Sequence, residues 1–366
     1  MSYYILPKNN NNIVVNLYAD ELKNDEIVVS YSLFNYYNEL YRYASNTHIS
    51  SDISFNSYEE IEKIVNTYSF LLNKVPGSKI SVSKLKPISN IFYDLIEISV
   101  TLNLFEPFNN KPINILNITK NIYDSINFCK IIRDNLHDNI VSIENIENYD
   151  AVQKNLENQK FDFLFFETTN DNTQNYIRTF IEVLMYILRY QELGGFAIIK
   201  ITNIFHKSIV DIVYFLTSIF EKVYVIKPNT SNTISFDKYI VCNNFVSNKN
   251  NINYNKLNYF KLFVFLKKNE NKNITSLLDI EIPYYFMSKL SEMNNIIGQQ
   301  ILESLDQIIS ILKSKNKEDK LDIIKKTNIQ KCIKWCEKYK IPYNKFTEKT
   351  NIFLTTEKEE IIDSIV

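Results

Sequence analysis

Glycine is scarce in this sequence, which has only four glycines among its 366 residues, at positions 77, 194, 195 and 298. No glycine occurs between Ser78 and Leu193. Glycine lets the backbone take positive φ values and approach a bound ligand closely. The long glycine-free stretch therefore leaves no room for a glycine-rich ligand loop in the first half of the chain.

Cysteine and histidine are also few, with four and three residues. Cys332 and Cys336 lie one helical turn apart, and the other two cysteines are isolated in the sequence. No group has the ligand spacing of a zinc site, so no metal is expected. We expect Cys332 and Cys336 to be small core residues in a protein from a reducing compartment.

Long apolar runs are absent, since none approaches the roughly 20 residues of a membrane span. The first residues, MSYYILPKNNNN, lack the basic and apolar regions of a signal peptide. The sequence thus predicts a soluble, cytoplasmic protein with no membrane partner. The net charge of −1 argues against a general nucleic-acid binder but leaves a local basic patch open.

The first 112 residues have a mixed pattern. Short strands are expected over 13–17 and 26–31, on either side of a polar turn. Apolar residues at helical spacing predict helices over 57–75 and 89–105, which Pro76-Gly77 and Pro107 end.

Short apolar runs and amphipathic stretches then alternate. Strands are predicted over 113–118, 140–143, 161–166, 196–201, 223–226 and 239–245, and helices over 123–136, 152–159, 172–193 and 207–220. Gly194-Gly195 is expected to end the helix over 172–193. Such alternation is typical of a parallel sheet covered on both faces. The last two strands lack a helix between them, so they should pair antiparallel.

The alternation ends near residue 250. An apolar, aromatic segment covers 254–265, and amphipathic helices are predicted over 282–313 and 318–340. The pattern divides the chain into an N-terminal extension (1–88), an α/β domain (89–250) and a C-terminal helical region (251–366).

The segments GGFAIIKI and FEKVYVIKPNTSNTISFDKYIVCNNF resemble the end of an FtsJ-like RNA ribose 2′-O-methyltransferase domain. In that family a strand after Gly-Gly ends in a catalytic lysine, a later strand runs into Lys-Pro, and an acidic residue precedes the last strand. The wider chain resembles versions encoded by large DNA viruses. The resemblance implies a Rossmann-like methyltransferase sheet with an antiparallel last strand and helical extensions.

The family uses a Lys-Asp-Lys-Glu tetrad, in which the second lysine deprotonates a ribose 2′-hydroxyl. The resemblance places Lys200 at that position and Glu167 at the position of the aspartate. Asp237 takes the place of the glutamate. The segment SNIFYDLIEI places Asp94 where the first lysine should be, so the charge there is inverted.

The family binds S-adenosylmethionine in a glycine-rich loop after its first strand. The resemblance places Asn117, Lys120, Tyr123, Asp124 and Glu144 at the cofactor-binding positions, with the glycine positions held by Lys120, Tyr123 and Asp124. The side chains of Lys120 and Tyr123 are expected to fill the cofactor's space. Glu144 follows the second strand and could accept hydrogen bonds from a ribose.

These departures predict a pseudoenzyme of the methyltransferase fold that acts as a binding or scaffold subunit and takes no cofactor. The alternative is an active S-adenosylmethionine-dependent RNA cap 2′-O-methyltransferase. A third hypothesis is a structural component whose former cleft has no role. The expected compartment is the cytoplasm, and a viral factory or the virion are alternative locations.

A protein partner is expected at the C-terminal helices, and RNA stays open as a second partner. The amphipathic helix over 282–313 carries a wide apolar stripe of Ile296, Ile297, Ile301, Leu302, Leu305, Ile308, Ile309 and Leu312. The stripe either packs within the chain or pairs with another subunit. A basic patch of Lys84, Lys86, Lys120, Lys130 and Arg133, as against scattered surface cations, is also open.

Overall fold

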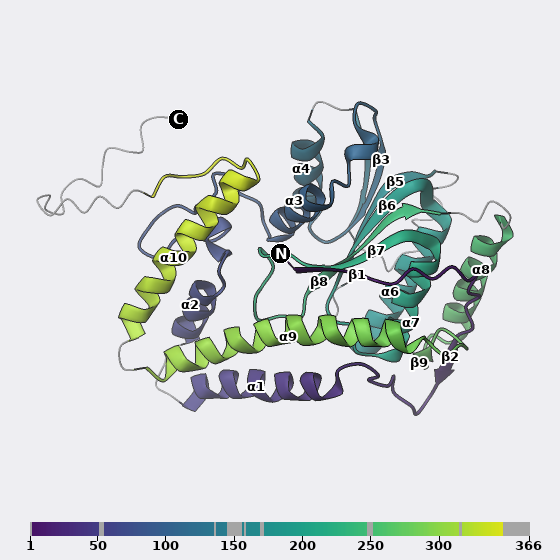
Figure 1. The fold of residues 1–366 in the computed structure, drawn as a ribbon, viewed down its shortest axis with the longest axis horizontal. Helices are drawn as coiled ribbons and strands as arrows, with labels where there is room; N and C mark the ends of the chain where they lie inside the picture. The colour runs from purple at the N-terminus through teal and green to yellow at the C-terminus, as the bar shows by residue number, and fades with distance from the viewer. Residues whose placement is uncertain are drawn as a thin grey trace, which may run out of the picture.

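A seven-stranded sheet forms the centre of the computed structural model (Figure 1). The structure describes residues 2–50, 55–134, 137–144, 156, 159–168, 172–246, 252–314 and 317–346. The strands follow the order β1-β7-β8-β6-β5-β3-β4. Their bounds are β1 (Ser2–Ile5), β3 (Asn114–Ile118), β4 (Asn139–Ile143), β5 (Phe161–Glu167), β6 (Gln191–Ile201), β7 (Phe220–Lys227) and β8 (Lys238–Phe245).

Most of the sheet is parallel. Strands β4, β3, β5 and β6 pair parallel with one another in that order, and β8 pairs antiparallel with both β6 and β7. Strand β7 therefore runs in the same direction as β6, while β8 and β1 run the other way. The predicted α/β class and the antiparallel last strand are confirmed, and the arrangement is consistent with a Rossmann-like fold.

Both faces of the sheet are covered because its strands are apolar on both sides. In β5, Phe163 and Phe165 enter one hydrophobic cluster, while Leu164 and Phe166 enter the other. One face packs against α3 (Ile91–Leu102) and α4 (Ile122–Arg133), and the other against α6 (Thr173–Tyr190) and α7 (Lys207–Ile219) (Figure 1). These helices and strands confirm the alternating pattern. The helix predicted over 152–159 lies almost wholly outside the described residues.

The prediction that Gly194 and Gly195 end a helix is wrong. Both residues lie inside β6. Helix α6 ends at Tyr190, and the register between β5 and β6 shifts between the pairs Phe161–Gln191 and Phe163–Phe196. Gly194 has a φ of +76°. A Cβ atom on Gly195 would lie 2.5 Å from the Asp162 carbonyl oxygen. The glycines thus serve an irregularity that depends on a partner strand, which local pattern does not reveal.

The strands predicted over 13–17 and 26–31 are wrong. Ile13 and Val15 are buried. However, the Val15 amide donates to the side-chain oxygen Asn258 Oδ1 at 2.9 Å, and not to the backbone carbonyl of a neighbouring strand. Ile27 forms only an isolated bridge with His206. The N-terminal strands are β1, which pairs with β7, and β2 (Tyr18–Asp20), which pairs with β9 (Asn273–Ser276).

The remaining helices surround this core. They are α1 (Tyr31–Ser50), α2 (Phe55–Val65), α8 (Ile252–Lys268), α9 (Tyr284–Leu312) and α10 (Lys317–Lys338), with 3₁₀ turns η1 (Ser69–Leu71) and η2 (Glu106–Phe108). Figure 1 shows α9 running below the sheet beside α1, with α10 and α2 at one end of the molecule. One hydrophobic cluster contains Leu6, Leu116 and Ile297, so both extensions share a core with the α/β domain.

The apolar stripe of α9 faces this shared core. Ile297, Ile301, Leu305 and Ile308 are completely buried, and Ile309 and Leu312 nearly so. Leu302 is half-buried, and Ile296 is exposed to 39 %. Cys332 and Cys336 are buried in α10, as predicted. Among the described residues, no helix is both long and apolar enough to cross a bilayer.

Candidate functional site

The ends of three adjacent strands bring Glu167, Lys200 and Tyr239 side by side. Glu167 pairs with Lys200 across β5 and β6, and Lys200 pairs with Tyr239 across β6 and β8. Paired residues of neighbouring strands project from the same face of a sheet. The Lys200 Nζ atom lies 3.2 Å from Glu167 Oε1 in a largely buried ion pair.

Both carboxylate oxygens of Glu167 are engaged. Besides Lys200, Glu167 accepts hydrogen bonds at Oε2 from Thr119 Oγ1 at 2.7 Å and from Asn121 Nδ2 at 3.1 Å. Burial acts to raise the pKa of Glu167, but Lys200 and these hydrogen bonds together hold the pKa below its usual value. Glu167 is therefore an ionised acceptor with its partners already in place.

Asp94 approaches this cluster from α3 and is almost completely buried. Its carboxylate accepts hydrogen bonds from Thr230 Oγ1, from Ser231 Oγ at 3.0 Å and from Tyr239 OH at 2.8 Å. Burial raises the pKa of Asp94 to about 6, although these hydrogen bonds and the charge of Lys200 oppose the shift. The hydroxyls of Thr230 and Ser231 fix the loop after β7 onto α3, and that of Tyr239 attaches strand β8.

Glu97, one turn further along α3, makes a second attachment. It accepts hydrogen bonds from Asn229 Nδ2 at 2.9 Å and from Trp335 Nε1 at 3.1 Å. Glu97 is completely buried. Helix α3, the loop after β7 and helix α10 are therefore joined through two buried carboxylates. The sequence signal was the separation of three residues between Asp94 and Glu97, which places both on one side of a helix.

Asp237 lies near the cluster, but its carboxylate forms no hydrogen bond with Lys200 within the described residues. Its backbone oxygen accepts a hydrogen bond from Lys227 Nζ at 3.0 Å, and the same amine donates to the carbonyls of Asn232 and Ser235. Burial lowers the pKa of Lys227 to about 8, against the effect of Asp237 and Asp94. Lys227 thus closes the loop between β7 and β8 on itself.

The five positions expected to bind a cofactor have different environments. Lys120, Tyr123 and Glu144 are exposed. Asp124 is completely buried and accepts hydrogen bonds from the Ile88 amide at 2.8 Å and the Ser89 amide at 2.6 Å, so it anchors the chain where α3 begins. Asn117 is buried, and neither polar atom of its side chain has a hydrogen-bond partner in the described structure.

The turn between β3 and α4 lacks the positive φ values that glycine residues would allow. No residue from Asn117 to Asp124 has a positive φ. Thr119 and Asn121, rather than Lys120 and Tyr123, fold over the strand ends and reach Glu167. The backbone of this turn therefore needs no glycine, and the side chains that close it differ from those expected.

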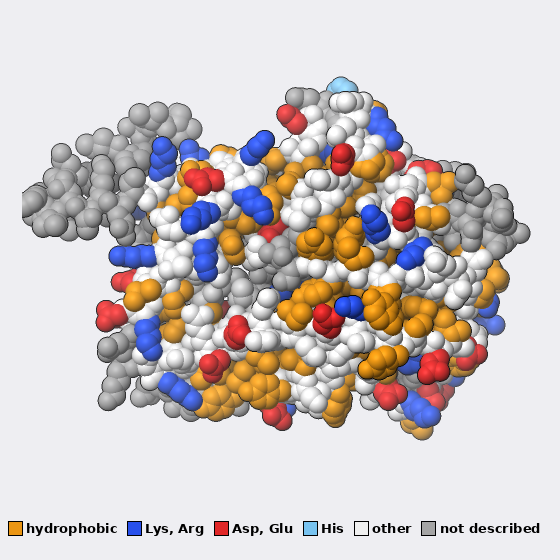
Figure 2. All heavy atoms as spheres, in the orientation of Figure 1, with side chains coloured by type: hydrophobic (Ala, Val, Ile, Leu, Met, Phe, Trp, Pro, Cys, Tyr) orange, Lys and Arg blue, Asp and Glu red, His pale blue; other side chains and the backbone are white. Residues whose placement is uncertain are grey.

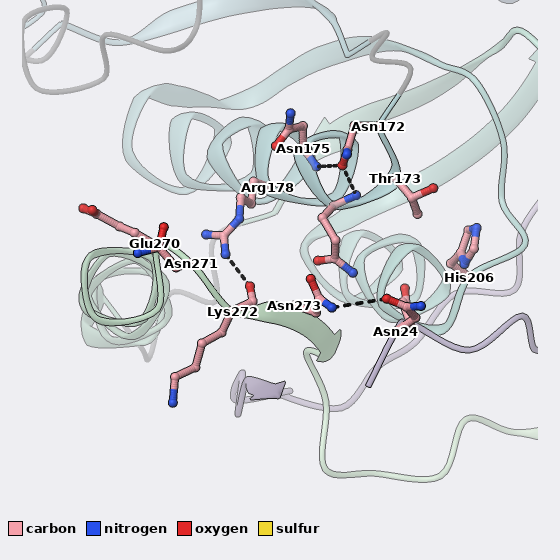
Figure 3. A pocket seen from close by; sticks show the side chains of 12 residues that line it. Asn24, Asn172, Thr173, Asn175, Arg178, His206, Glu270, Asn271, Lys272 and Asn273 are labelled. Atoms are coloured by element: carbon pink, nitrogen blue, oxygen red, sulfur yellow. Dashed lines mark hydrogen bonds between the residues drawn. The ribbon is translucent and has the colours of Figure 1, made fainter. Parts of the chain in front are cut away.

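A separate polar pocket of about 550 Å³ lies where α6 and α7 begin and α8 ends (Figure 3). His206 lines it and is the N-cap residue of α7. Asn172 Oδ1 caps α6 by accepting from the Gln174 and Asn175 amides, and Asn273 donates to Asn24. Arg178 donates to the carbonyl oxygen of Asn269 at 2.7 Å and to that of Lys272. Many of the polar groups that line the pocket therefore form hydrogen bonds with other groups of the chain.

Asp25 also lines this pocket, and burial raises its pKa to about 7. Its carboxylate accepts from the Ser208 amide at 3.2 Å, so it caps the start of α7 from a distant part of the chain. Among the described residues, no group of three or more His, Cys, Asp or Glu residues is placed to hold a metal ion. The pocket is thus a capping arrangement for two helices.

No protein-family model and no curated protein sequence matches this chain.

Proposed function

We propose that this chain is an FtsJ-like methyltransferase-fold protein that has lost S-adenosylmethionine binding and catalysis and acts as a binding or scaffold subunit. The observation that carries the proposal is the environment of Asp94. The sequence resemblance assigns Asp94 to the position of the family's first lysine. Asp94 is buried and accepts hydrogen bonds from Thr230, Ser231 and Tyr239. A carboxylate used in this way connects helix α3 to a loop and leaves no cation at that position.

The environment of Lys200 supports the same proposal. A catalytic lysine must reach a substrate hydroxyl within hydrogen-bond distance. Here the amine is paired with Glu167, which Thr119 and Asn121 also hold. We infer that the former tetrad now stabilises the edge of the sheet, so that the fold can present its other surfaces to a partner.

The alternative function, an active RNA cap 2′-O-methyltransferase, rests on the retained Lys200–Glu167 pair at the strand ends. Purified protein should be incubated with radiolabelled S-adenosylmethionine and with capped or uncapped RNA. We expect no methyl incorporation. Incorporation that disappears in Lys200→Ala would establish the alternative instead.

Cofactor binding tests the proposal independently of the RNA substrate. A ligand that binds only the native state at 100-fold over its Kd stabilises the fold by about 2.7 kcal/mol. We expect no melting shift with millimolar S-adenosylmethionine and no heat of binding by calorimetry. A reproducible shift with matching calorimetry would show that a diverged loop still holds the cofactor.

Asp94→Lys alone should not restore activity. The substitution would place an ammonium group among three hydroxyls in a buried site and would remove the acceptor that they share. An uncompensated buried charge costs several kcal/mol. We therefore expect loss of stability in urea unfolding and no methyl transfer, and a gain of activity would contradict the proposal.

The partner of the scaffold is proposed to contact the C-terminal helices. Because the stripe of α9 is buried within the chain, this contact would use exposed apolar residues such as Tyr284, Tyr285 and Ile323. Tagged wild-type protein and Ile323→Lys should be purified from native cells and their co-purifying proteins quantified. We expect Ile323→Lys to stay folded and lose a stoichiometric partner, whereas Ile301→Lys should unfold. Equal recovery with both Ile323 forms, or no partner at all, would remove support for this contact.

A further inference from the structure

A strongly basic surface lies at the end of the molecule formed by α10. Segment 66–93 contains four lysines and no acidic residue, and segment 323–345 contains seven lysines and one glutamate. Together the two segments carry a formal charge of +10, in a chain whose net charge is −1. Figure 2 shows Lys and Arg side chains gathered over the position of α10. We call these eleven lysines the lysine surface.

The two segments lie side by side, although about 250 residues separate them in the sequence. The Lys84 amide donates to the Pro342 carbonyl at 2.9 Å, and the Asn344 amide donates to the Val82 carbonyl at 2.8 Å. Asn328 Nδ2 in α10 donates to the Ile64 carbonyl at 2.7 Å. The lysines of both segments therefore belong to one surface.

Most of these lysines form no ion pair with an acidic residue that the structure describes. The following are exposed and form no ion pair within the described part of the chain: Lys74, Lys79, Lys84, Lys86, Lys331, Lys334, Lys338, Lys340 and Lys345. Lys325 is paired with Asp322. An unpaired cluster of like charges raises the electrostatic energy of the fold unless an anion binds there.

Helix α10 orders part of the surface. Lys331, Lys334 and Lys338 follow the spacing i, i+3, i+7 and so lie on one side of the helix. The neighbouring residues Trp335 and Cys336 are buried on the side that faces the chain. The acidic residues of the first turn, Glu318 and Asp319, are at the other end of α10. The positive charge is thus concentrated in the C-terminal half of the helix.

The chemistry of this surface fits a phosphate backbone better than a protein. Lysine is depleted in protein–protein interfaces, whereas aromatic residues and arginine are enriched there. Nucleic acids bind through lysine and arginine that neutralise phosphates and release counterions. We propose that the lysine surface binds the phosphate backbone of a nucleic acid without reading its sequence. The proposal does not depend on the function inferred for the Lys200 cluster.

The lysine surface differs in its residues from the basic patch that the sequence left open. Arg133 is buried and paired with Asp138, with Nε at 2.9 Å from Oδ2, so it is not available to a ligand. Lys84 and Lys86 instead join the lysines of α10. The net charge of the whole chain concealed this arrangement, because the rest of the sequence carries an excess of acidic residues.

The first test is fluorescence anisotropy with a labelled 20-nucleotide single-stranded RNA and DNA of the same mixed sequence, at several salt concentrations. The triple variant Lys331→Glu, Lys334→Glu, Lys338→Glu should weaken binding about tenfold or more, and the salt slope should become less negative by about 2, since each phosphate contact on single strands contributes about 0.7. The matched control is Lys222→Glu, Lys256→Glu, Lys268→Glu, which makes the same charge change at exposed lysines of β7 and α8.

Loss in the α10 triple with near wild-type binding in the control supports the proposal, and the ratio of the RNA and DNA affinities shows which nucleic acid is preferred. Absence of binding to the wild type at low salt would overturn it, as would equal losses in both triples. Binding of polyglutamate in preference to RNA would identify an acidic protein as the partner and would also overturn it.

The second test uses the wild-type chain alone, so it does not depend on the folding of a variant. Lysine acetylation should be mapped by mass spectrometry with and without RNA. We expect protection of Lys84, Lys86, Lys331, Lys334 and Lys338 and none at Lys222, Lys256 or Lys268. Uniform protection, or none at the lysine surface, would contradict the proposal.

Discussion

Lys200 and Glu167 occupy paired positions at the ends of two parallel strands, and their charged atoms lie 3.2 Å apart. The pairing is a direct consequence of strand register, since no loop has to fold to bring the two side chains together. Thr119 and Asn121 add two donors from the next strand end. The edge of the sheet therefore carries a charged cluster in which both oxygens of the Glu167 carboxylate have donors within the chain.

Replacing Lys200 by alanine should reduce stability. The substitution leaves Glu167 ionised and mostly buried with only two neutral donors. A hydrogen bond to a charged group contributes about 1.5–3 kcal/mol, so we expect the free energy of unfolding to fall by about 2 kcal/mol. Urea unfolding followed by circular dichroism measures this change.

Lys222→Ala is a suitable control for this prediction, because Lys222 is exposed on β7. Surface substitutions of this kind usually change stability by less than about 0.5 kcal/mol. A Lys200→Ala variant as stable as Lys222→Ala would show that the ion pair contributes little to the fold.

Asp94 should make stability depend on pH in a definite direction. Its pKa is about 6 in the fold, against 3.8 for an ordinary aspartate. Between these values the folded state binds more protons than the unfolded state, so the contribution of Asp94 is present at low pH and is lost as the pH rises through about 6. One pKa unit corresponds to about 1.4 kcal/mol, which makes the loss on the order of 3 kcal/mol.

Asn at position 94 keeps the shape of the side chain and removes the titration. We therefore expect the stability of the wild type relative to Asp94→Asn to fall between pH 4 and pH 7, and to be constant above pH 7. Asp25 has a raised pKa too, but it is present in both proteins and cancels in the comparison. Parallel pH profiles of the two proteins would contradict this account of Asp94.

The sequence predicts β3 to β8 of the sheet because each contains a short apolar run, which in β5 is buried on both faces. It misses β1 (Ser2–Ile5), an edge strand in which Tyr3 and Ile5 are exposed. The local pattern fails for Ile13 and Val15, which are buried without forming a strand. Their backbone partners are side chains of α8, more than 240 residues away. The local pattern fails at Gly194 and Gly195 for a similar reason, since the irregularity that needs them depends on strand β5.

The candidate site was predictable where parallel strands end together. Glu167 and Lys200 each close a strand, so their proximity follows from the fold class. Tyr239 was missed because its place depends on the register of an antiparallel strand with a long loop before it. Trp335 was missed because nothing in the local sequence of α10 indicates that it reaches α3.

Trp335 and Glu97 should couple the docking of α10 to α3. Their hydrogen bond is 3.1 Å long and buried. Trp335→Phe, Glu97→Gln and the double variant form a cycle, and contacting residues of this kind typically couple by 0.5–3 kcal/mol. We expect about 1 kcal/mol of coupling from urea unfolding, and additive effects would show that the hydrogen bond has no net role.

Native-state thiol labelling gives an independent measure of the same docking. Cys332 and Cys336 are buried on α10, and burial raises the pKa of Cys336 to about 12, so both should react slowly. Glu97→Ala should speed their labelling, because two buried donors lose their acceptor. Labelling of Cys242, in strand β8, should not change. An unchanged rate at both α10 cysteines would argue that other contacts hold the helix.

Gly298→Ala should destabilise the chain, although alanine is the better helix former by about 1 kcal/mol. Gly298 lies inside α9, and a Cβ atom there would come within 2.5 Å of Leu33 Cδ2 and within 3.0 Å of its Cγ, on α1. Because several atoms of Leu33 are involved, the side chain cannot avoid the clash by moving its tip alone. Overpacking of this kind costs about 1–3 kcal/mol, so we expect a net loss of about 1 kcal/mol in urea unfolding. Leu33→Ala should make the glycine replaceable: in that background Gly298→Ala should be neutral or stabilising, and a loss of the same size in both backgrounds would show that the close approach of α1 and α9 is not what requires glycine.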